Sequence, residues 1–160
     1  MKGNSKDIYF MRQAIKLSLK TIQKNAGGPF GAVIVKNGEI ISHGSNRVTS
    51  TNDPTAHAEI IAIRGACQTL GTFHLNGCEI YTSCEPCPMC LSAIYWARID
   101  KVYYANTRSD ASYIGFDDGE LYKELGKPMS DRTMPMEQLL RDEALSVFQE
   151  WQNKDDKIQY

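Results

Sequence analysis

The chain has 160 residues, of which 42% are apolar and 23% are charged, and its net charge is −1. This length fits one domain, residues 1–160, that can bury a sizeable core, and the composition is that of an ordinary globular protein. The small net charge argues against a nucleic-acid partner, because phosphate-binding domains usually carry an excess of basic residues. No run of about 18 apolar residues is present, so a membrane span is not expected.

The chain contains five cysteines, an odd number that favours reduced thiols over a disulfide framework. The N-terminal residues also lack the apolar core and the cleavage site of a secretory signal. We therefore expect a cytoplasmic protein. Cys67 and Cys78 are expected to be small core residues.

The first quarter of the chain predicts a helix followed by a hairpin. The apolar residues of the helix recur at steps of three and four. They are Ile8, Met11, Ile15, Leu19 and Ile22. Gly27-Gly28-Pro29 ends the helix. Asn37-Gly38 then separates the apolar runs 30–35 and 39–41, which is a strong hairpin signal.

The middle of the chain alternates helices and strands. Asp53-Pro54 predicts the start of a second helix, since Asp is a good N-cap and Pro suits the first helical position, and Leu70-Gly71 predicts its end. A strand at 78–82, a helix from Pro86–Pro88 to about residue 97 and a strand at 101–105 follow. This alternation predicts a three-layer α/β/α domain.

The last third gives weaker signals. Gly115–Asp118 is expected to form a loop or the entry to a helix, and a further helix is expected from about Met136 to Trp151. The side chains predicted to face inward from that helix are Leu139, Leu140, Leu145 and Phe148.

Two clusters carry metal-ligand chemistry. His57-Ala58-Glu59 lies near the start of the second expected helix, and Cys87 and Cys90 open the third. Residues three apart share a helix face, and a helix N-terminus lowers the pKa of thiols, so both sulfurs suit zinc. With a nitrogen of His57 they fill three tetrahedral positions and leave the fourth open for water, as in a catalytic zinc site.

Glu59 is the expected proton carrier. Zinc lowers the pKa of a bound water from roughly 16 towards about 7, and the Glu59 side chain is long enough to reach that water without ligating the metal. It can take the proton and pass it to a ring nitrogen and a leaving amine. H-x-E followed by P-C-x-x-C is the known signature of zinc-dependent nucleobase deaminases.

Two non-catalytic interpretations use the same residues. Cys84 also lies three residues from Cys87, so a closed structural site of Cys84, Cys87, Cys90 and His57 is one alternative, although it leaves Glu59 without a role. The other is a zinc-folded interaction module. It predicts that Glu59→Gln has no functional consequence and that chelation simply unfolds the chain.

The chain resembles the cytidine deaminase superfamily in residues 27–35, 51–59, 82–90 and 93–98. Gly115–Asp118 and the terminal Tyr160 are similar to small bacterial guanine deaminases in particular. The resemblance implies an α/β fold of the three-layer α/β/α cytidine-deaminase type, with a central mixed sheet and one Zn²⁺ per subunit. It also implies hydrolysis of guanine to xanthine and ammonia, in purine catabolism or salvage.

The same resemblance implies the residues that contact the purine. Phe30 and Trp96 are expected to border the base as flat apolar walls, and Asn46 to hydrogen-bond its edge. Asp118 is expected to be a second acid near the ring, with the neighbouring Asp117 as the alternative.

The resemblance further implies a homodimer in which the C-terminal segment swaps between subunits and Tyr160 closes the pocket. A tRNA adenosine deaminase shares the metal residues, but the net charge of −1 and the tail 151–160, which is not an arginine-rich arm, count against it. Deaminases of cytosine, guanosine or related bases are further alternatives, because the zinc motif does not select a substrate.

Overall fold

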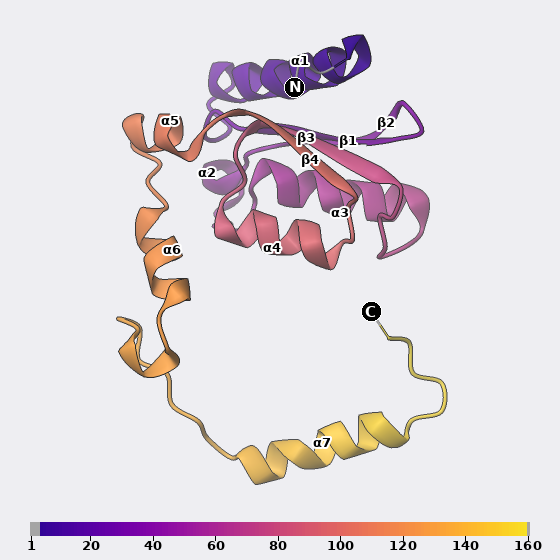
Figure 1. The fold of residues 1–160 in the computed structure, drawn as a ribbon, viewed down its shortest axis with the longest axis vertical. Helices are drawn as coiled ribbons and strands as arrows, with labels where there is room; N and C mark the ends of the chain where they lie inside the picture. The colour runs from indigo at the N-terminus through magenta and orange to yellow at the C-terminus, as the bar shows by residue number, and fades with distance from the viewer. Residues whose placement is uncertain (1–3, 160) are drawn as a thin grey trace. The chain divides into compact units, whose positions relative to one another are not determined.

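A computed structural model describes residues 4–159, so the terminal Tyr160 lies outside the described residues (Figure 1). The chain forms two compact units, one ending at Gly119 and one beginning at Glu120. Within residues 4–159, no helix has the length and apolar character needed to cross a membrane.

The first unit is built on a four-stranded mixed sheet. Its strands are β1 (Gly31–Lys36), β2 (Glu39–Ser45), β3 (Cys78–Cys84) and β4 (Lys101–Asn106). Their order is β2-β1-β3-β4, with β1 antiparallel to both neighbours and β3 parallel to β4. The predicted hairpin is confirmed, since Asn37 and Gly38 both have positive φ, as a tight turn between twisted strands requires.

Helices cover both faces of this sheet, so the predicted three-layer arrangement is confirmed (Figure 1). On one face, α1 (Ser5–Gln23) packs Phe10 against Val33, Val35 and Tyr81. On the other lie α3 (Ala58–Leu70) and α4 (Pro88–Trp96). The core on that face consists mainly of Ala32, Ile34, Ala58, Ala62, Ala66, Ile80 and Ile94.

Small residues let α3 approach the sheet closely. A Cβ atom added at Gly44 of β2 would lie 2.0 Å from the Ala58 carbonyl oxygen and 2.7 Å from the Ala62 nitrogen. Only glycine fits such an approach without moving the backbone. The first turn of α3 is therefore fixed against the sheet.

The predicted start of the second helix is wrong. α3 begins at Ala58, with His57 as its N-cap, and a short helix α2 (Val48–Thr51) precedes it. The Asp53 carboxylate instead accepts hydrogen bonds from the backbone N–H and the hydroxyl of Thr55, at 2.8 and 2.7 Å. Asp53 therefore closes a local turn, which competes with helix capping for the same side chain.

Of the apolar stripe predicted for α1, Met11 is half-buried and packs against the core, while the other four residues stay exposed. Ile8, Ile15, Leu19 and Ile22 are between 45% and 50% exposed, whereas Phe10, Ala14 and Thr21 are buried. A Cβ atom at Gly31 would lie 2.4 Å from the Ala14 carbonyl oxygen. The face of α1 that packs on the sheet is thus the one whose small residues permit a close approach.

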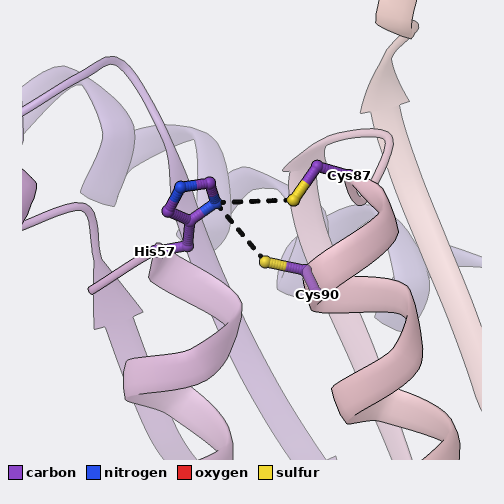
Figure 2. Close-up of side chains that lie close together, drawn as sticks. All are labelled: His57, Cys87 and Cys90. Carbon is purple, nitrogen blue, oxygen red and sulfur yellow. Dashed lines mark hydrogen bonds between the residues drawn. The ribbon is translucent and has the colours of Figure 1, made fainter. Parts of the chain in front are cut away.

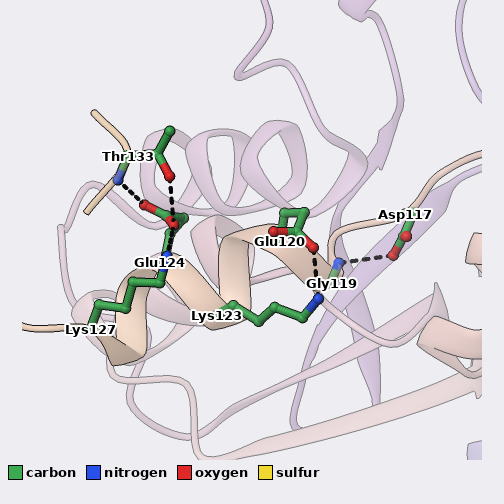
Figure 3. Close-up of polar contacts among 7 residues, drawn as sticks. All are labelled: Asp117, Gly119, Glu120, Lys123, Glu124, Lys127 and Thr133. Carbon is green, nitrogen blue, oxygen red and sulfur yellow. Dashed lines mark hydrogen bonds and ion pairs between the residues drawn. The ribbon is translucent and has the colours of Figure 1, made fainter. Parts of the chain in front are cut away.

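After β4, α5 (Arg108–Tyr113) completes the first unit, and Gly115–Asp118 forms the expected loop. The next elements are α6 (Gly119–Gly126), a 3-10 turn η1 (Met129–Asp131) and α7 (Arg141–Asn153). Figure 3 shows Glu124 of α6 accepting hydrogen bonds from the backbone N–H and hydroxyl of Thr133. These bonds and the adjacent Lys127 ammonium, which acts most strongly, lower the pKa of Glu124 to about 2.

α7 differs from its prediction in two ways. It begins at Arg141, five residues later than expected, because Leu140 has a left-handed backbone conformation. Leu139, Leu140 and Phe148, predicted to face inward, are between 72% and 79% exposed. The described part of the second unit, residues 120–159, therefore does not bury their apolar surface.

Candidate metal centre and active site

The site lies at one edge of the sheet, where two helices begin. His57 is the N-cap of α3, and Cys87 is the N-cap of α4, with Pro88 at the first helical position. Both N-caps have extended backbone conformations and use no side-chain capping bond, so the imidazole and the thiol remain available for other contacts. Cys90 lies in the first turn of α4 and is fully buried.

The geometry of the three side chains fits zinc. Figure 2 shows the His57 Nδ1 atom facing both sulfurs. It lies 3.6 Å from Cys87 Sγ and 3.5 Å from Cys90 Sγ. Ligands at the usual tetrahedral zinc distances, about 2.0 Å for nitrogen and about 2.3 Å for sulfur, lie about 3.6 Å apart. All three ligand atoms lie within 4.8 Å of one another, so the predicted His-Cys-Cys site is confirmed.

Cys84 is not part of this cluster. Among residues 4–159, the potential metal ligands that gather at this site are His57, Cys87 and Cys90. The Cys84 Sγ atom instead lies 3.6 Å from the carbonyl oxygen of Thr107. The closed four-ligand alternative is therefore not supported, and a tetrahedral metal keeps one position open.

The two ligand thiols differ in their ionisation. The pKa of Cys87 is lowered to about 4, chiefly because the Cys90 thiol donates a hydrogen bond to it, with His57 adding to the effect. The pKa of Cys90 is raised by that same hydrogen bond and by burial. In the metal-free protein the pair thus holds one thiolate, on Cys87, and the pKa of His57 is raised by its hydrogen bond to Cys87.

Glu59, the second residue of α3, is 6% exposed. Burial raises the pKa of its carboxyl group, and the charge of Cys87 raises it further. Its Oε1 atom lies 3.3 Å from the hydroxyl of Thr82 on β3. A buried carboxyl with a raised pKa beside metal ligands suits a group that accepts and returns a proton.

Asn46 and Phe30 come from strand ends at the same edge of the sheet. The Asn46 N–H donates to the Phe30 carbonyl oxygen, and the Asn46 Oδ1 atom accepts from the N–H groups of Gly28 and Val48. These bonds engage the Oδ1 atom, so a ligand contact of Asn46 would have to use its Nδ2 group, which can only donate.

Phe116 extends the aromatic surface at Phe30. The two rings meet edge to face, with centroids 4.9 Å apart at 88°. Sequence reasoning gave Phe116 no role of its own, although it stands in the Gly-Phe-Asp-Asp stretch that carried part of the resemblance.

The structure distinguishes the two adjacent aspartates. Asp117 accepts a hydrogen bond from the Gly119 N–H at 2.9 Å, at the start of α6 (Figure 3). The pKa of Asp118 is raised by burial, and the charge of Cys87 raises it further against the opposing effect of Arg108. Burial and the charge of a ligand thiolate thus both act on the carboxyl group of Asp118.

Trp96 is not brought to the metal ligands within one chain. It ends α4 and is 70% exposed. At a rise of about 1.5 Å per residue, nine residues place it about 13 Å from Cys87 along the helix. The role predicted for Tyr160 falls outside the described residues.

Comparison with known proteins places the chain in a family. Residues 4–106 match the family model of the cytidine and deoxycytidylate deaminase zinc-binding region. This stretch contains all three zinc ligands and Glu59. The chain therefore belongs to the cytidine and deoxycytidylate deaminase family, and His57, Cys87 and Cys90 form its zinc-binding site.

Individual relatives extend this comparison. The guanine deaminase of Bacillus subtilis (strain 168) is 54% identical over 151 residues, covering 94% of this chain and 97% of that protein. An X-ray structure of the Bacillus subtilis guanine deaminase has a TM-score of 0.92 and 53% identity, covering 95% of this chain and 97% of that one. The tRNA-specific adenosine deaminase of Aquifex aeolicus is 46% identical over 61% of this chain and 64% of its own length.

The ionisation of the ligand pair predicts selective alkylation of the metal-free protein. Cys87, with a pKa of about 4, remains a thiolate at pH 6, while Cys67, Cys78, Cys84 and Cys90 have raised pKa values. Iodoacetamide at pH 6 should label Cys87 at least about tenfold faster than any other cysteine. Mass spectrometry of the digested protein measures this. The Cys87 labelling rate should change little between pH 8 and pH 6, and it should fall only as the pH approaches 4.

Zinc is the control for this experiment, because a coordinated sulfur is protected. Addition of one equivalent of Zn²⁺ should suppress labelling of Cys87. Preferential labelling of Cys90, or equal labelling of all five cysteines, would contradict the assignment.

Proposed function

We propose that this chain is a zinc-dependent hydrolase that converts guanine and water to xanthine and ammonia. The observation that carries the proposal is 54% identity to a guanine deaminase across 94% of the chain, which extends well beyond the zinc-binding region at residues 4–106. Because the site depends on reduced thiols and all five cysteines are free, we place the reaction in the cytoplasm.

Glu59 moves the proton in this proposal. Zinc held by the three ligands supplies a Lewis acid that lowers the pKa of a coordinated water. The Glu59 carboxylate takes one proton from the attacking water and delivers it to a ring nitrogen. It then takes the second proton from the hydroxyl group formed on the ring carbon and delivers it to the leaving amine. Its burial keeps bulk water from competing for that proton. Its raised pKa brings it nearer to the value that favours both steps at neutral pH.

Four further side chains suit a purine. Phe30 and its partner Phe116 offer an aromatic wall for the flat base. The Nδ2 group of Asn46 donates to an acceptor on the purine edge, since its Oδ1 atom is already engaged by two backbone N–H groups. Guanine also carries donors at N1 and at the 2-amino group, and Asp118 is the acceptor we assign to them.

Glu59→Gln tests the proton transfer. The amide keeps the shape of the side chain and leaves the ligands untouched, but it cannot accept a proton. We expect one zinc per chain, an unchanged circular dichroism spectrum and ammonia release from guanine about a thousandfold slower. A variant that retains most of its turnover would remove Glu59 from the mechanism.

The substrate panel for this assay is guanine, guanosine, adenine, cytosine, cytidine and a tRNA anticodon stem-loop. Turnover of guanine alone supports the proposal. Turnover of another base without guanine would overturn the substrate while leaving the zinc chemistry in place.

Adjacent aspartates provide a matched pair of variants for the second acid. Asp118→Asn should lower kcat/KM for guanine about ten- to a hundredfold, because a charged hydrogen bond to the base is lost. Asp117→Asn should stay within about threefold, since Asp117 bonds the N–H of Gly119 at the start of α6. Steady-state kinetics on both zinc-loaded variants measures this. The reverse order of effects would assign the acid to Asp117.

We also propose a homodimer in which the C-terminal segment swaps between subunits. The support is apolar surface left open in each unit: Leu139, Leu140 and Phe148 around α7, and the stripe on α1. Apolar area of this extent is usually covered by a partner. In this proposal residues 1–160 act as one deaminase domain, and Tyr160 of the partner closes the pocket.

Mixing two inactive chains tests the swap. One chain carries Glu59→Gln with an intact C-terminus, and the other lacks residues 154–160. In a swapped dimer the first chain supplies its tail to the second, so co-refolding should restore activity. The expected activity corresponds to at most about one working site in each mixed dimer. A dimer by light scattering that shows no restored activity would contradict the swap, and a monomer would contradict the assembly.

A further inference from the structure

Thr82 is a polar residue in a row of β3 that otherwise belongs to the core. Successive side chains of a strand alternate between faces, so Ile80, Thr82 and Cys84 share the face that meets α3 and α4. Thr82 is 1% exposed, and its partner in the register is the fully buried Ala32 of β1. A hydroxyl at such a position is costly unless it has hydrogen-bond partners.

Two acceptors lie beside this hydroxyl. The Thr82 Oγ1 atom is 2.9 Å from the carbonyl oxygen of Cys84 and 3.3 Å from Glu59 Oε1. The Cys84 carbonyl is fixed because it belongs to the same strand. A hydroxyl donates one hydrogen and also accepts. It can therefore donate to the ionised Glu59 carboxylate, or donate to the Cys84 carbonyl and accept from the protonated Glu59 carboxyl group.

β3 holds Thr82 in a fixed position. Thr82 is paired on both sides, with Ala32 of β1 and Tyr104 of β4, and β3 lies between those two strands (Figure 1). The Glu59 side chain has several rotatable bonds, and its helix alone does not fix where the carboxyl group lies. A reacting group misplaced by about 1 Å loses about a hundredfold in rate.

We propose that Thr82 is a positioning residue that holds the Glu59 carboxyl group beside the zinc site. The inference rests on the proposed deaminase function. Thr82 touches neither the zinc nor the base in this arrangement. Its effect passes entirely through Glu59.

Thr82→Val and Thr82→Ser separate the hydroxyl from the packing. Valine keeps the branched shape and removes the hydroxyl, whereas serine keeps the hydroxyl and removes the methyl group. Thr21→Val is the matched control: Thr21 is also buried, but its hydroxyl donates only to the Leu17 carbonyl oxygen of its own helix, at 2.8 Å. Zinc content, kcat and KM for guanine are measured for each variant.

The expected result is a loss confined to kcat. Thr82→Val should lower kcat about ten- to a hundredfold, with KM within about twofold and one zinc per chain. Thr82→Ser should recover at least about a third of the wild-type kcat, and Thr21→Val should match the wild type. A kcat for Thr82→Val within about twofold of wild type overturns the proposal. So does a serine variant as slow as the valine one.

Crystal structures of zinc-loaded wild type and Thr82→Val give a readout that needs no turnover. The carboxyl group of Glu59 should occupy one position in the wild type, and it should shift or split between positions in the variant. An unchanged Glu59 overturns the positioning role. If the wild type releases no ammonia from any base of the panel, the deaminase function fails instead, and these structures still decide whether Thr82 holds Glu59.

Discussion

The site depends on the close approach of two helix N-termini. α3 and α4 each contribute their N-cap residue, His57 and Cys87, to one cluster. That approach requires α3 to lie low on the sheet, which Gly44 and the alanines of α3 permit. The helix N-termini also act electrostatically, because their dipoles favour the negative charge of the ligand sulfurs.

The same constraint fixes where Glu59, the proposed proton carrier, lies. Because His57 ends the loop and Ala58 begins the helix, Glu59 falls in the first turn and faces the interior beside Cys90 and Thr82. A charged carboxylate is costly in such a place, so the protonated form is favoured more than it would be in water. The same burial that makes the charged form of Glu59 costly also raises its pKa, which suits the proton transfer that we propose for it at neutral pH.

The sequence predicted the parts of this site whose geometry is local. The spacing of residues at two helix starts identifies His57, Glu59, Cys87 and Cys90. Such spacing allows their side chains few arrangements relative to one another. Predictions that depend on contacts distant in the sequence were less accurate: four of the five apolar stripe residues of α1 stay exposed, and so do Leu139, Leu140 and Phe148 around α7. The helix start predicted at Asp53 was wrong for another reason, because a turn and a helix cap compete for the same carboxylate.

The choice of substrate depends on other residues than metal binding does. The zinc ligands and Glu59 lie within residues 4–106, the part matched by the family model, and they suit any ring carbon that bears an amine. Discrimination must therefore come from groups that the base touches elsewhere. In the proposed function residues 116–118 supply such groups: Phe116 meets Phe30, Asp117 closes the turn that begins α6, and the charge of Cys87 acts on the carboxyl group of Asp118. If this proposal holds, one short loop carries both an aromatic wall and an acceptor for the base, and substitutions there should change the preferred base while the zinc site stays the same.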